Sequence, residues 1–265
     1  MKRITFITFF AFTLLITGRG MAGETITIAG DPCSAPLAKE LGSAFTKKTG
    51  IHVDVSSFSC QAGIDHATEG KADIGVNTKN ELSSDLQGTD VTHTVIAKSP
   101  IVLIVNKKNP VKNLTYEQVQ GIFSGKIKNW KDVSDTDMEI KNVMLMPCVT
   151  HAMSQQAALY GQDIAKIIPE KKGNPSTNTN ILVAENEGAI GQQIYGYESK
   201  DVKVLAIDGL LPDKKTLPVK YKFYQDYNVV TRWKPQGKVK EFIDFALSDE
   251  GISIIKSMKH IPVNQ

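Results

Sequence analysis

The chain of 265 residues is poor in cysteine and in long apolar runs. Three cysteines are too few for a disulfide scaffold and leave one unpaired. After the first 22 residues, no segment approaches the roughly 18 consecutive apolar residues of a membrane-spanning helix. CxxC, GxSxG and P-loop motifs are absent, so the sequence predicts no enzyme and no cofactor. The balance of 41% hydrophobic and 22% charged residues is typical of a globular chain and argues against disorder or a coiled coil.

The first 22 residues predict a signal peptide. Lys2 and Arg3 precede the mostly apolar stretch Ile4–Ile16, whose 13 residues are too few for a comfortable membrane span. The small residues Gly20 and Ala22 predict cleavage after Ala22. An uncleaved anchor helix is the alternative, and a lipid anchor is not expected because no cysteine follows the apolar run. We therefore expect an exported, periplasmic protein whose cysteines meet an oxidising compartment.

The charge of the chain gives no sign of a polyanionic partner. Beyond residue 22, 28 basic residues face 28 acidic ones. A neutral chain has no electrostatic preference for nucleic acid or an anionic membrane, so we expect neither as a partner.

Alternating strand and helix patterns predict an α/β fold. Strands predicted at 24–29, 51–57 and 72–76 are separated by turns and helices predicted at 36–49 and 64–69, which implies parallel strands with helical crossovers. In such sheets, ligands bind at the loops that follow the strands. Further strands are predicted at 91–97, 101–105, 143–145, 188–191, 202–207 and 221–231, and helices at 116–123, 153–160, 181–185, 238–247 and 251–258.

Several stretches carry a resemblance to a known family: Thr25–Pro36, Gly63–Gly75, Ile101–Val133, Glu187–Tyr195 and Gly237–Gly251. They resemble the phosphate-binding-type periplasmic solute-binding proteins over nearly the whole chain, and the FSGKIKNW block is the most specific part. The resemblance implies a type II periplasmic binding protein, with two α/β lobes joined by crossing strands, a ligand cleft between the lobes and hinge closure on binding. We expect a monomer with one lobe formed by 24–98 and 200–265 and the other by 99–199.

The departures from that family lie in its three ligand loops. The family binds phosphate through hydroxyls, backbone N–H groups and an arginine. Its first loop usually begins Gly-Ser-Ser-Thr, where this chain has Gly30–Cys33 (GDPC). The second loop is Ser59–Gly63 (SCQAG), and the third, Met146–Met153 (MPCVTHAM), lacks the arginine and both glycines of the family run. All three cysteines of the chain fall in these three loops.

Three thiols in one cleft predict a soft, thiophilic ligand. Three thiolates without a fourth ligand suit trivalent arsenic or antimony, and arsenite is uncharged near neutral pH. Helix N-termini are expected to lower the pKa values of the thiols. The expected sulfur ligands of the metalloid are Cys33, Cys60 and Cys148, surrounded by Ser34, Ser59, Gln61, Asn77, Thr78 and His151.

The sequence therefore predicts an exported arsenite-binding protein, and the resemblance to sensors in the wider class suggests a membrane histidine kinase as its partner. The alternative is a phosphate or arsenate binder that feeds an ABC permease. The sequence also allows a soft-metal site that adds His151 or Met153, a Cys33–Cys60 disulfide with Cys148 left over, or three independent buried cysteines. A thiol nucleophile formed by Cys148 and His151 is weakly supported because no orienting acid accompanies the pair.

Overall fold

A computed structural model describes residues 24–59, 61–80, 86, 90–145, 159, 171–173, 178–213, 215–217 and 219–263. Within these ranges, no helix is both long and apolar enough to span a membrane. The predicted signal peptide lies outside them, as does the predicted helix at 153–160 apart from Leu159. The elements, in chain order, are β1 (Thr25–Gly30), α1 (Ala35–Thr49), β2 (His52–Ser57), α2 (Ala62–Thr68), β3 (Ile74–Thr78), β4 (Thr92–Asn106), β5 (Asn113–Leu114), α4 (Tyr116–Phe123), η1 (Trp130–Asp132), β6 (Lys141–Leu145), β7 (Lys171–Gly173), α6 (Asn178–Ala184), β8 (Ala189–Ile194), β9 (Val202–Ile207), β10 (Tyr224–Thr231), α7 (Gly237–Ala246), α8 (Asp249–Ser257) and β11 (Ile261–Pro262).

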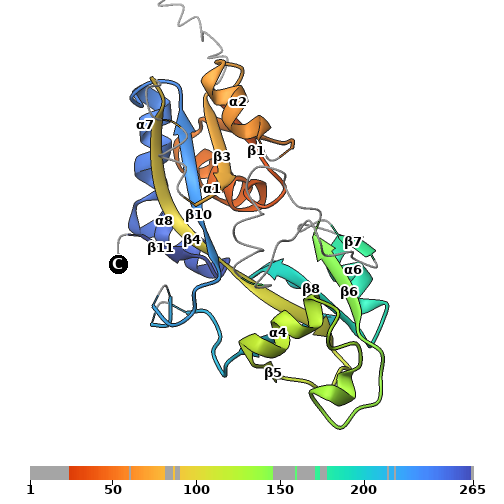
Figure 1. Ribbon diagram of the computed structural model, residues 1–265. Coiled ribbons are helices and arrows are strands. Elements are labelled where there is room, and N and C mark those ends of the chain that lie inside the picture. Colours follow the sequence, from red (N-terminus) through yellow and green to blue (C-terminus); the bar gives the residue numbers. More distant parts are fainter. Residues whose placement is uncertain are drawn as a thin grey trace, which may run out of the picture.

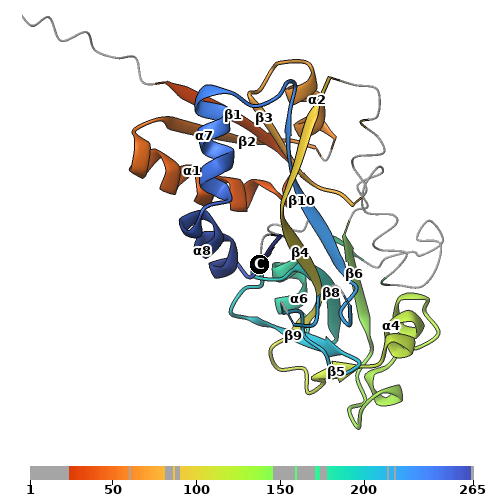
Figure 2. The ribbon, with the colours of Figure 1, turned by 90° about the vertical axis from the view of Figure 1, so that its left-hand side faces the viewer.

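The first lobe is built on β1, which pairs in parallel with β2 on one side and β3 on the other. This confirms the parallel strands predicted from the sequence. Helix α1 has a proline in its first turn and ends at Gly50, which takes a left-handed conformation (φ 79°) that glycine adopts without strain. Its apolar face buries Leu37, Leu41 and Phe45 against the sheet, and α7 and α8 lie beside it (Figure 2).

Strand β4 joins the two lobes. The sequence predicted two strands here, at 91–97 and 101–105, but the structure has one continuous strand, Thr92–Asn106. Its first half pairs with β10 and β11, and its second half, from Ile101 on, pairs with β8 and β9. Pro100, which has no N–H to donate, lies where the partners change. The strand therefore does not break between residues 97 and 101; instead, its hydrogen-bonded partner strands change there. Figure 1 shows β4 running from one lobe into the other.

The second lobe carries strands on both sides of the second half of β4. Strands β8, β6 and β7 pair with one another in parallel, whereas β9 pairs with β4 and β5. Helix α4 begins at the capping box of Thr115 and Gln118, and the buried Trp130 donates its indole N–H to the carbonyl of Gly188 (2.9 Å). The sequence predicted 200–265 in the first lobe. Because β9 pairs with the second half of β4, we propose that the chain returns to the first lobe after Phe223.

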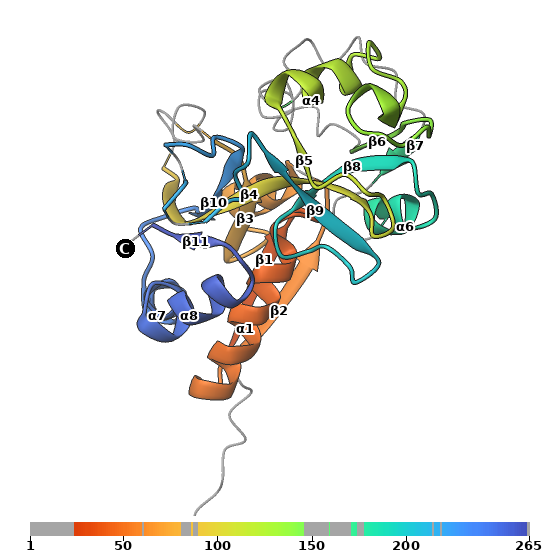
Figure 3. The same ribbon diagram turned by 90° about the horizontal axis from the view of Figure 1, so that it is seen from below.

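Each lobe has a hydrophobic core of its own. Phe45, Phe242 and Phe245 pack together in the first, where the rings of Phe45 and Phe242 meet edge to face at 5.4 Å. In the second lobe, alternate residues of β4 face two different clusters, so that Leu103 packs with Trp130 and Val102 packs on the opposite side. The view from below separates the two groups of elements on either side of β4 (Figure 3). Two cores joined by a shared strand define a two-lobe α/β architecture.

Two glycines allow α2 to approach the first sheet closely. A Cβ added at Gly75 on β3 would lie 2.3 Å from the carbonyl oxygen of Gly63 on α2, and one added at Gly63 would lie 2.8 Å from the carbonyl oxygen of Val76. Since real Cβ atoms do not approach backbone so closely, any side chain at either position pushes the helix off the sheet. The two glycines therefore set how closely α2, and the loop that precedes it, lie to the sheet.

We expect Gly75→Ala to lower the free energy of unfolding by about 2 kcal/mol, because the added methyl group overpacks a backbone contact that has no flexible side chain to yield. Urea denaturation followed by circular dichroism measures the change. Gly50→Asn is the matched control, because nothing lies within 4 Å of a Cβ there and asparagine tolerates the left-handed conformation. Equal stability of Gly75→Ala and the parent would contradict the close contact.

Candidate functional site

The loop between β1 and α1 folds around the carboxylate of Asp31. Oδ1 of Asp31 accepts hydrogen bonds from the N–H groups of Cys33 (2.7 Å) and Ser34 (2.8 Å), and its main-chain oxygen accepts the N–H of Ala35 (2.9 Å). Asp31 is 2% exposed. The amides of Cys33 and Ser34, directly before α1, are therefore bound to a carboxylate of the protein itself.

Ser34 also has its partners inside the protein. Its hydroxyl donates to the carbonyl of Val76 (3.1 Å) and accepts the N–H of Asp31 (3.0 Å), and its carbonyl accepts the hydroxyl proton of Tyr227 (2.6 Å). The side chain is completely buried. In this conformation Ser34 fixes the loop to β3 and β10, and its predicted contact with a ligand stays a prediction.

Cys33 carries a free thiol and is partly buried. Burial raises the pKa of the thiol well above its ordinary value, the nearby Asp31 carboxylate raises it further, and a hydrogen bond with the side chain of Thr78 only partly offsets both effects. The expectation that the helix N-terminus lowers the pKa of this thiol is therefore wrong for Cys33. The amides of Cys33 and Ser34 stabilise the carboxylate of Asp31, not a thiolate.

The other predicted sulfur ligands, Cys60 and Cys148, lie outside the described residues, as does His151. That the sulfur atoms of Cys33, Cys60 and Cys148 lie close together thus remains a prediction. Among the residues that the structure describes, no cluster of three or more His, Cys, Asp or Glu side chains is arranged to hold a metal ion.

The second predicted loop is described on both sides of residue 60. Ser59 is exposed, and its carbonyl accepts the N–H of Ala62 (3.1 Å). Gln61 is the N-cap of α2, but its side chain donates to Asp65 one turn later (3.1 Å) and leaves the helix end uncapped. Ser59 is therefore accessible to a ligand, while Gln61 is occupied within its own helix.

Asn77 and Thr78 end β3 next to the first loop. The N–H of Thr78 points to Oδ2 of Asp31 (3.4 Å), and Asn77 is completely buried. Oδ1 of Asn77 accepts from Asn228 on β10 (3.1 Å), whereas its Nδ2 has no hydrogen-bond partner. Of these two predicted contacts, Thr78 reaches the Asp31–Cys33 loop directly and Asn77 holds β3 in place.

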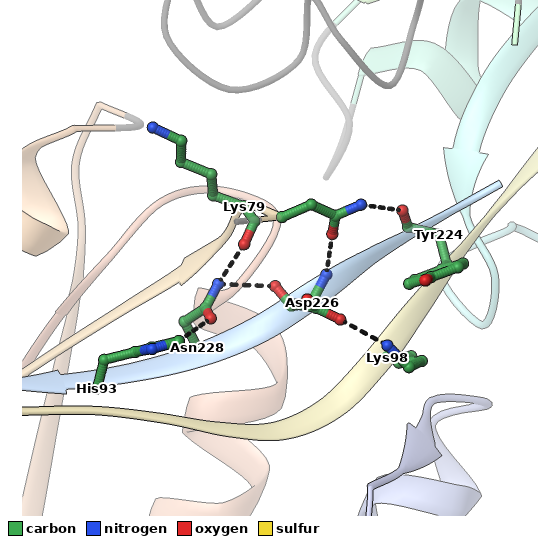
Figure 4. A network of polar contacts seen from close by, with 7 residues as sticks. Lys79, His93, Lys98, Tyr224, Asp226 and Asn228 are labelled. Atoms are coloured by element: carbon green, nitrogen blue, oxygen red, sulfur yellow. Dashed lines mark hydrogen bonds and ion pairs between the residues drawn. The ribbon is translucent and has the colours of Figure 1, made fainter. Parts of the chain in front are cut away.

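A polar network holds the end of β3 against β10 and β4 (Figure 4). Nδ2 of Asn228 donates to the carbonyls of Lys79 (2.7 Å) and Asp226 (3.0 Å), and Oδ1 of Asn228 lies 2.5 Å from Nε2 of His93. The carboxylate of Asp226 pairs with Lys98 on β4 (2.9 Å). Both charged side chains are partly buried, so this pair is less screened than a surface ion pair.

Two tyrosines and a histidine that sequence reasoning missed complete the surroundings of the loop. Tyr227 holds Ser34, as described above, and the hydroxyl of Tyr197 donates to the carbonyl of Cys33 (3.2 Å). Nε2 of His260 lies 3.3 Å from the same hydroxyl, and Nδ1 of His260 is buried without a partner. No local pattern marks these residues, since the fold brings them from far along the chain. Asp31, in contrast, lies in the turn before α1, where an aspartate side chain commonly accepts the main-chain N–H groups that follow it.

The described cleft residues include no arginine, and the sequence limits where one could come from. Arg232 is the only arginine after residue 22. It follows the end of β10 that pairs with Thr92, its guanidinium lies 5.0 Å from the ring of Trp233, and it approaches Gly70. The candidate loop lies beside Tyr227, nearer the other end of β10. A bidentate guanidinium contact to an oxyanion is therefore not available to this site.

The two lobes, the shared strand and the loops gathered at strand ends define the class of periplasmic binding proteins. The chain belongs to the PBP superfamily, whose domain profile matches residues 17–250. Among similar proteins, the phosphate-binding protein PstS of Bacillus subtilis is 28% identical over 254 residues, covering 93% of this chain and 83% of that protein. PstS of Staphylococcus epidermidis is 26% identical over 250 residues, covering 84% of this chain and 74% of the relative.

Solved structures of phosphate-binding proteins are also similar to this chain. A substrate-binding protein of a phosphate ABC transporter from Clostridium perfringens, described as putative and solved with bound phosphate, superposes with a TM-score of 0.81 at 28% identity, covering 91% of this chain and all of that one. An ABC-type phosphate transport receptor from Vibrio cholerae gives 0.69 at 25% identity, covering 89% of this chain and 99% of the other. The expected family and two-lobe fold are confirmed, and the proteins to which the chain is similar are named as binding proteins.

We expect Asp31→Asn to lower the pKa of the Cys33 thiol, because the substitution removes the negative charge that opposes the thiolate. In a protein whose Cys60 and Cys148 are replaced by serine, the pH dependence of the reaction of Cys33 with iodoacetamide reports this pKa. Asp73→Asn is the matched control, since Asp73 lies at the opposite end of β1, where it binds Thr27. An unchanged or raised pKa in Asp31→Asn would show that Asp31 does not govern the thiol.

We expect the stability of the protein to fall between about pH 6.5 and pH 4 because of His260. Burial lowers the pKa of His260 from 6.5 to about 4. Between these pH values the histidine is protonated in the unfolded chain but neutral in the folded protein, so acidification favours unfolding. The loss approaches about 3 kcal/mol at the acid end. Urea denaturation at several pH values should show a smaller loss in His260→Gln, while His52→Gln, which changes an exposed histidine, should keep the parental slope. Parallel slopes for the parent and His260→Gln would contradict the assignment.

Proposed function

We propose that this protein is an exported solute-binding protein that captures a small inorganic oxyacid between its lobes and presents it to a membrane partner. Membership of the PBP superfamily supports the binding role, and the similar proteins named for phosphate support a ligand of that size and chemistry. The signal peptide predicted at residues 1–22 supports export.

The buried carboxylate of Asp31 is the observation that carries the proposal about the ligand. It accepts the N–H groups of Cys33 and Ser34, directly before α1, and places negative charge at the loop. A fully ionised oxyanion would meet repulsion there, because like charges at short range in a partly buried site are costly. An oxyacid that keeps a hydroxyl proton can instead donate a charge-assisted hydrogen bond to a carboxylate. We therefore propose a ligand that retains at least one hydroxyl group.

The first candidate is protonated phosphate or arsenate, delivered to an ABC importer. The names of the similar proteins favour it, and both ligands keep a hydroxyl group near neutral pH. Without an arginine, the backbone and hydroxyl groups of the loops would have to bind the remaining oxygen atoms, with the exposed Ser59 as an accessible donor.

The second candidate is arsenite, reported to a membrane sensor kinase. The Cys33 thiol in the first loop, the high pKa of that thiol and the lack of an arginine favour an uncharged, thiophilic ligand. Three thiols that condense with As(OH)₃ form three As–S bonds and release three water molecules, with no net proton and no electron transferred. Thiols that remain protonated suit this reaction, in which Cys60 and Cys148 would supply the other two sulfur atoms.

Calorimetry on the reduced protein, with a phosphine reductant present, tests both candidates. Phosphate, arsenate, arsenite and sulfate are titrated separately, sulfate being the matched control because it carries no proton near neutral pH. We expect one of the hydroxyl-bearing ligands to bind and sulfate not to. Sulfate that binds as tightly as phosphate, or the absence of binding by all four, would overturn the proposal.

Cys33→Ser then separates the candidates. If arsenite is the ligand, its affinity should fall about 100-fold or more, because a hydroxyl is a poor ligand for a soft centre. If phosphate or arsenate is the ligand, the affinity should change less than about tenfold, since serine can still donate a hydrogen bond. Arsenite binding that survives Cys33→Ser, Cys60→Ser and Cys148→Ser alike would rule out the sulfur site.

A further inference from the structure

Tyr197 contacts both lobes at the candidate site. It belongs to the short segment between β8 and β9, and both of these strands pair within the second lobe. Its main-chain oxygen accepts a hydrogen bond from Nδ2 of Asn180 on α6 (2.8 Å), and Oδ1 of the same Asn180 accepts the N–H of Ser199 (3.1 Å). The backbone around Tyr197 is thus fixed to the second lobe.

The side chain of Tyr197 reaches into the first lobe. Its hydroxyl has one proton, which it donates to the carbonyl of Cys33, so we assign the proton on His260 to Nε2, which donates to the tyrosine oxygen. The hydrogen bonds then run in one direction, from His260 through Tyr197 to Cys33. Removing the hydroxyl would leave the Nε2–H of His260 and the carbonyl of Cys33 without this partner.

The neighbours of Tyr197 leave the segment little room. A Cβ at Gly196, which has a φ of 101°, would lie 2.2 Å from the carbonyl oxygen of Met258. Glu198 pairs with Lys259, whose ammonium group also lies 4.4 Å from the ring centroid of Tyr195. Met258 and Lys259, at the end of α8, thus contact the segment from the first lobe, while Asn180 binds it from the second.

We propose that Tyr197 is a positioning residue of the candidate site, which transmits the placement of the second lobe to the Cys33 carbonyl and so sets the orientation of the first ligand loop. The proposal rests on the proposed function only in taking this loop as the site. A lobe movement of the kind that closes binding proteins must either carry Cys33 along with Tyr197 or break their hydrogen bond. Cys33 is therefore coupled to α6 through Tyr197.

A double-mutant cycle tests the coupling without any ligand. In a protein that carries Cys60→Ser and Cys148→Ser, Cys33 is the one remaining thiol, and its rate of alkylation by iodoacetamide is measured. We expect Tyr197→Phe and Asn180→Ala each to change this rate about fivefold, the effect of one lost hydrogen bond. The double variant should match Tyr197→Phe alone, because Asn180 acts through Tyr197.

Two matched controls accompany the cycle. Tyr227→Phe also removes a hydroxyl from the same loop, but Tyr227 lies in the first lobe, so Asn180→Ala should keep its effect in that background. Asn142→Ala removes a second-lobe asparagine that binds the carbonyl of Ile122 and should leave the rate unchanged. If Asn180→Ala fails to fold, Asn180→Asp keeps the acceptor for Ser199 and loses only the donor to Tyr197.

An unchanged rate in Asn180→Ala, or effects of Asn180→Ala and Tyr197→Phe that multiply, would overturn the proposal. Because the readout is a reaction of the free protein, it is independent of the calorimetric test of the ligand. The coupling can therefore fail while the proposed function stands, and the reverse also holds.

Discussion

The change of partner along β4 is the constraint on which the rest of the structure depends. One strand supplies hydrogen bonds to two sheets, and Pro100 stands where one set of partners ends and the other begins. Each half must then bury its own apolar face, which is why two cores form on a single chain. The candidate loop sits close to this junction, within reach of residues from both lobes.

The first loop carries a buried negative charge and has no arginine near it. The carboxylate of Asp31 holds the amides of Cys33 and Ser34, and the lone arginine beyond residue 22 lies toward the other end of β10. The local field therefore favours hydrogen-bond donors and disfavours additional negative charge. Burial is the main reason why the pKa of the Cys33 thiol is raised, and the Asp31 carboxylate raises it further.

Much of the fold could be predicted from the sequence, because the determinants are local. Alternation indicated β1 and β2, Thr115 indicated the start of α4, and the family resemblance implied two lobes. The assignment of β9 and the continuity of β4 could not be predicted, since both depend on which distant strand supplies the partner. The candidate site divides in the same way: Cys33 and Thr78 are predicted as ligand contacts from their loops and stay predictions, whereas Tyr197 and His260 are in contact although they lie more than 60 residues apart in the sequence.

The raised pKa of the Cys33 thiol has a consequence for the rate at which it reacts with oxidants. The thiolate, not the thiol, attacks disulfides and peroxides, so a thiol with a raised pKa exchanges slowly with oxidised partners. A residue that must stay reduced in order to work would be preserved by this kinetic protection, even where the surrounding redox potential favours its oxidation. Burial, together with the nearby carboxylate of Asp31, thereby slows the oxidation of the Cys33 thiol.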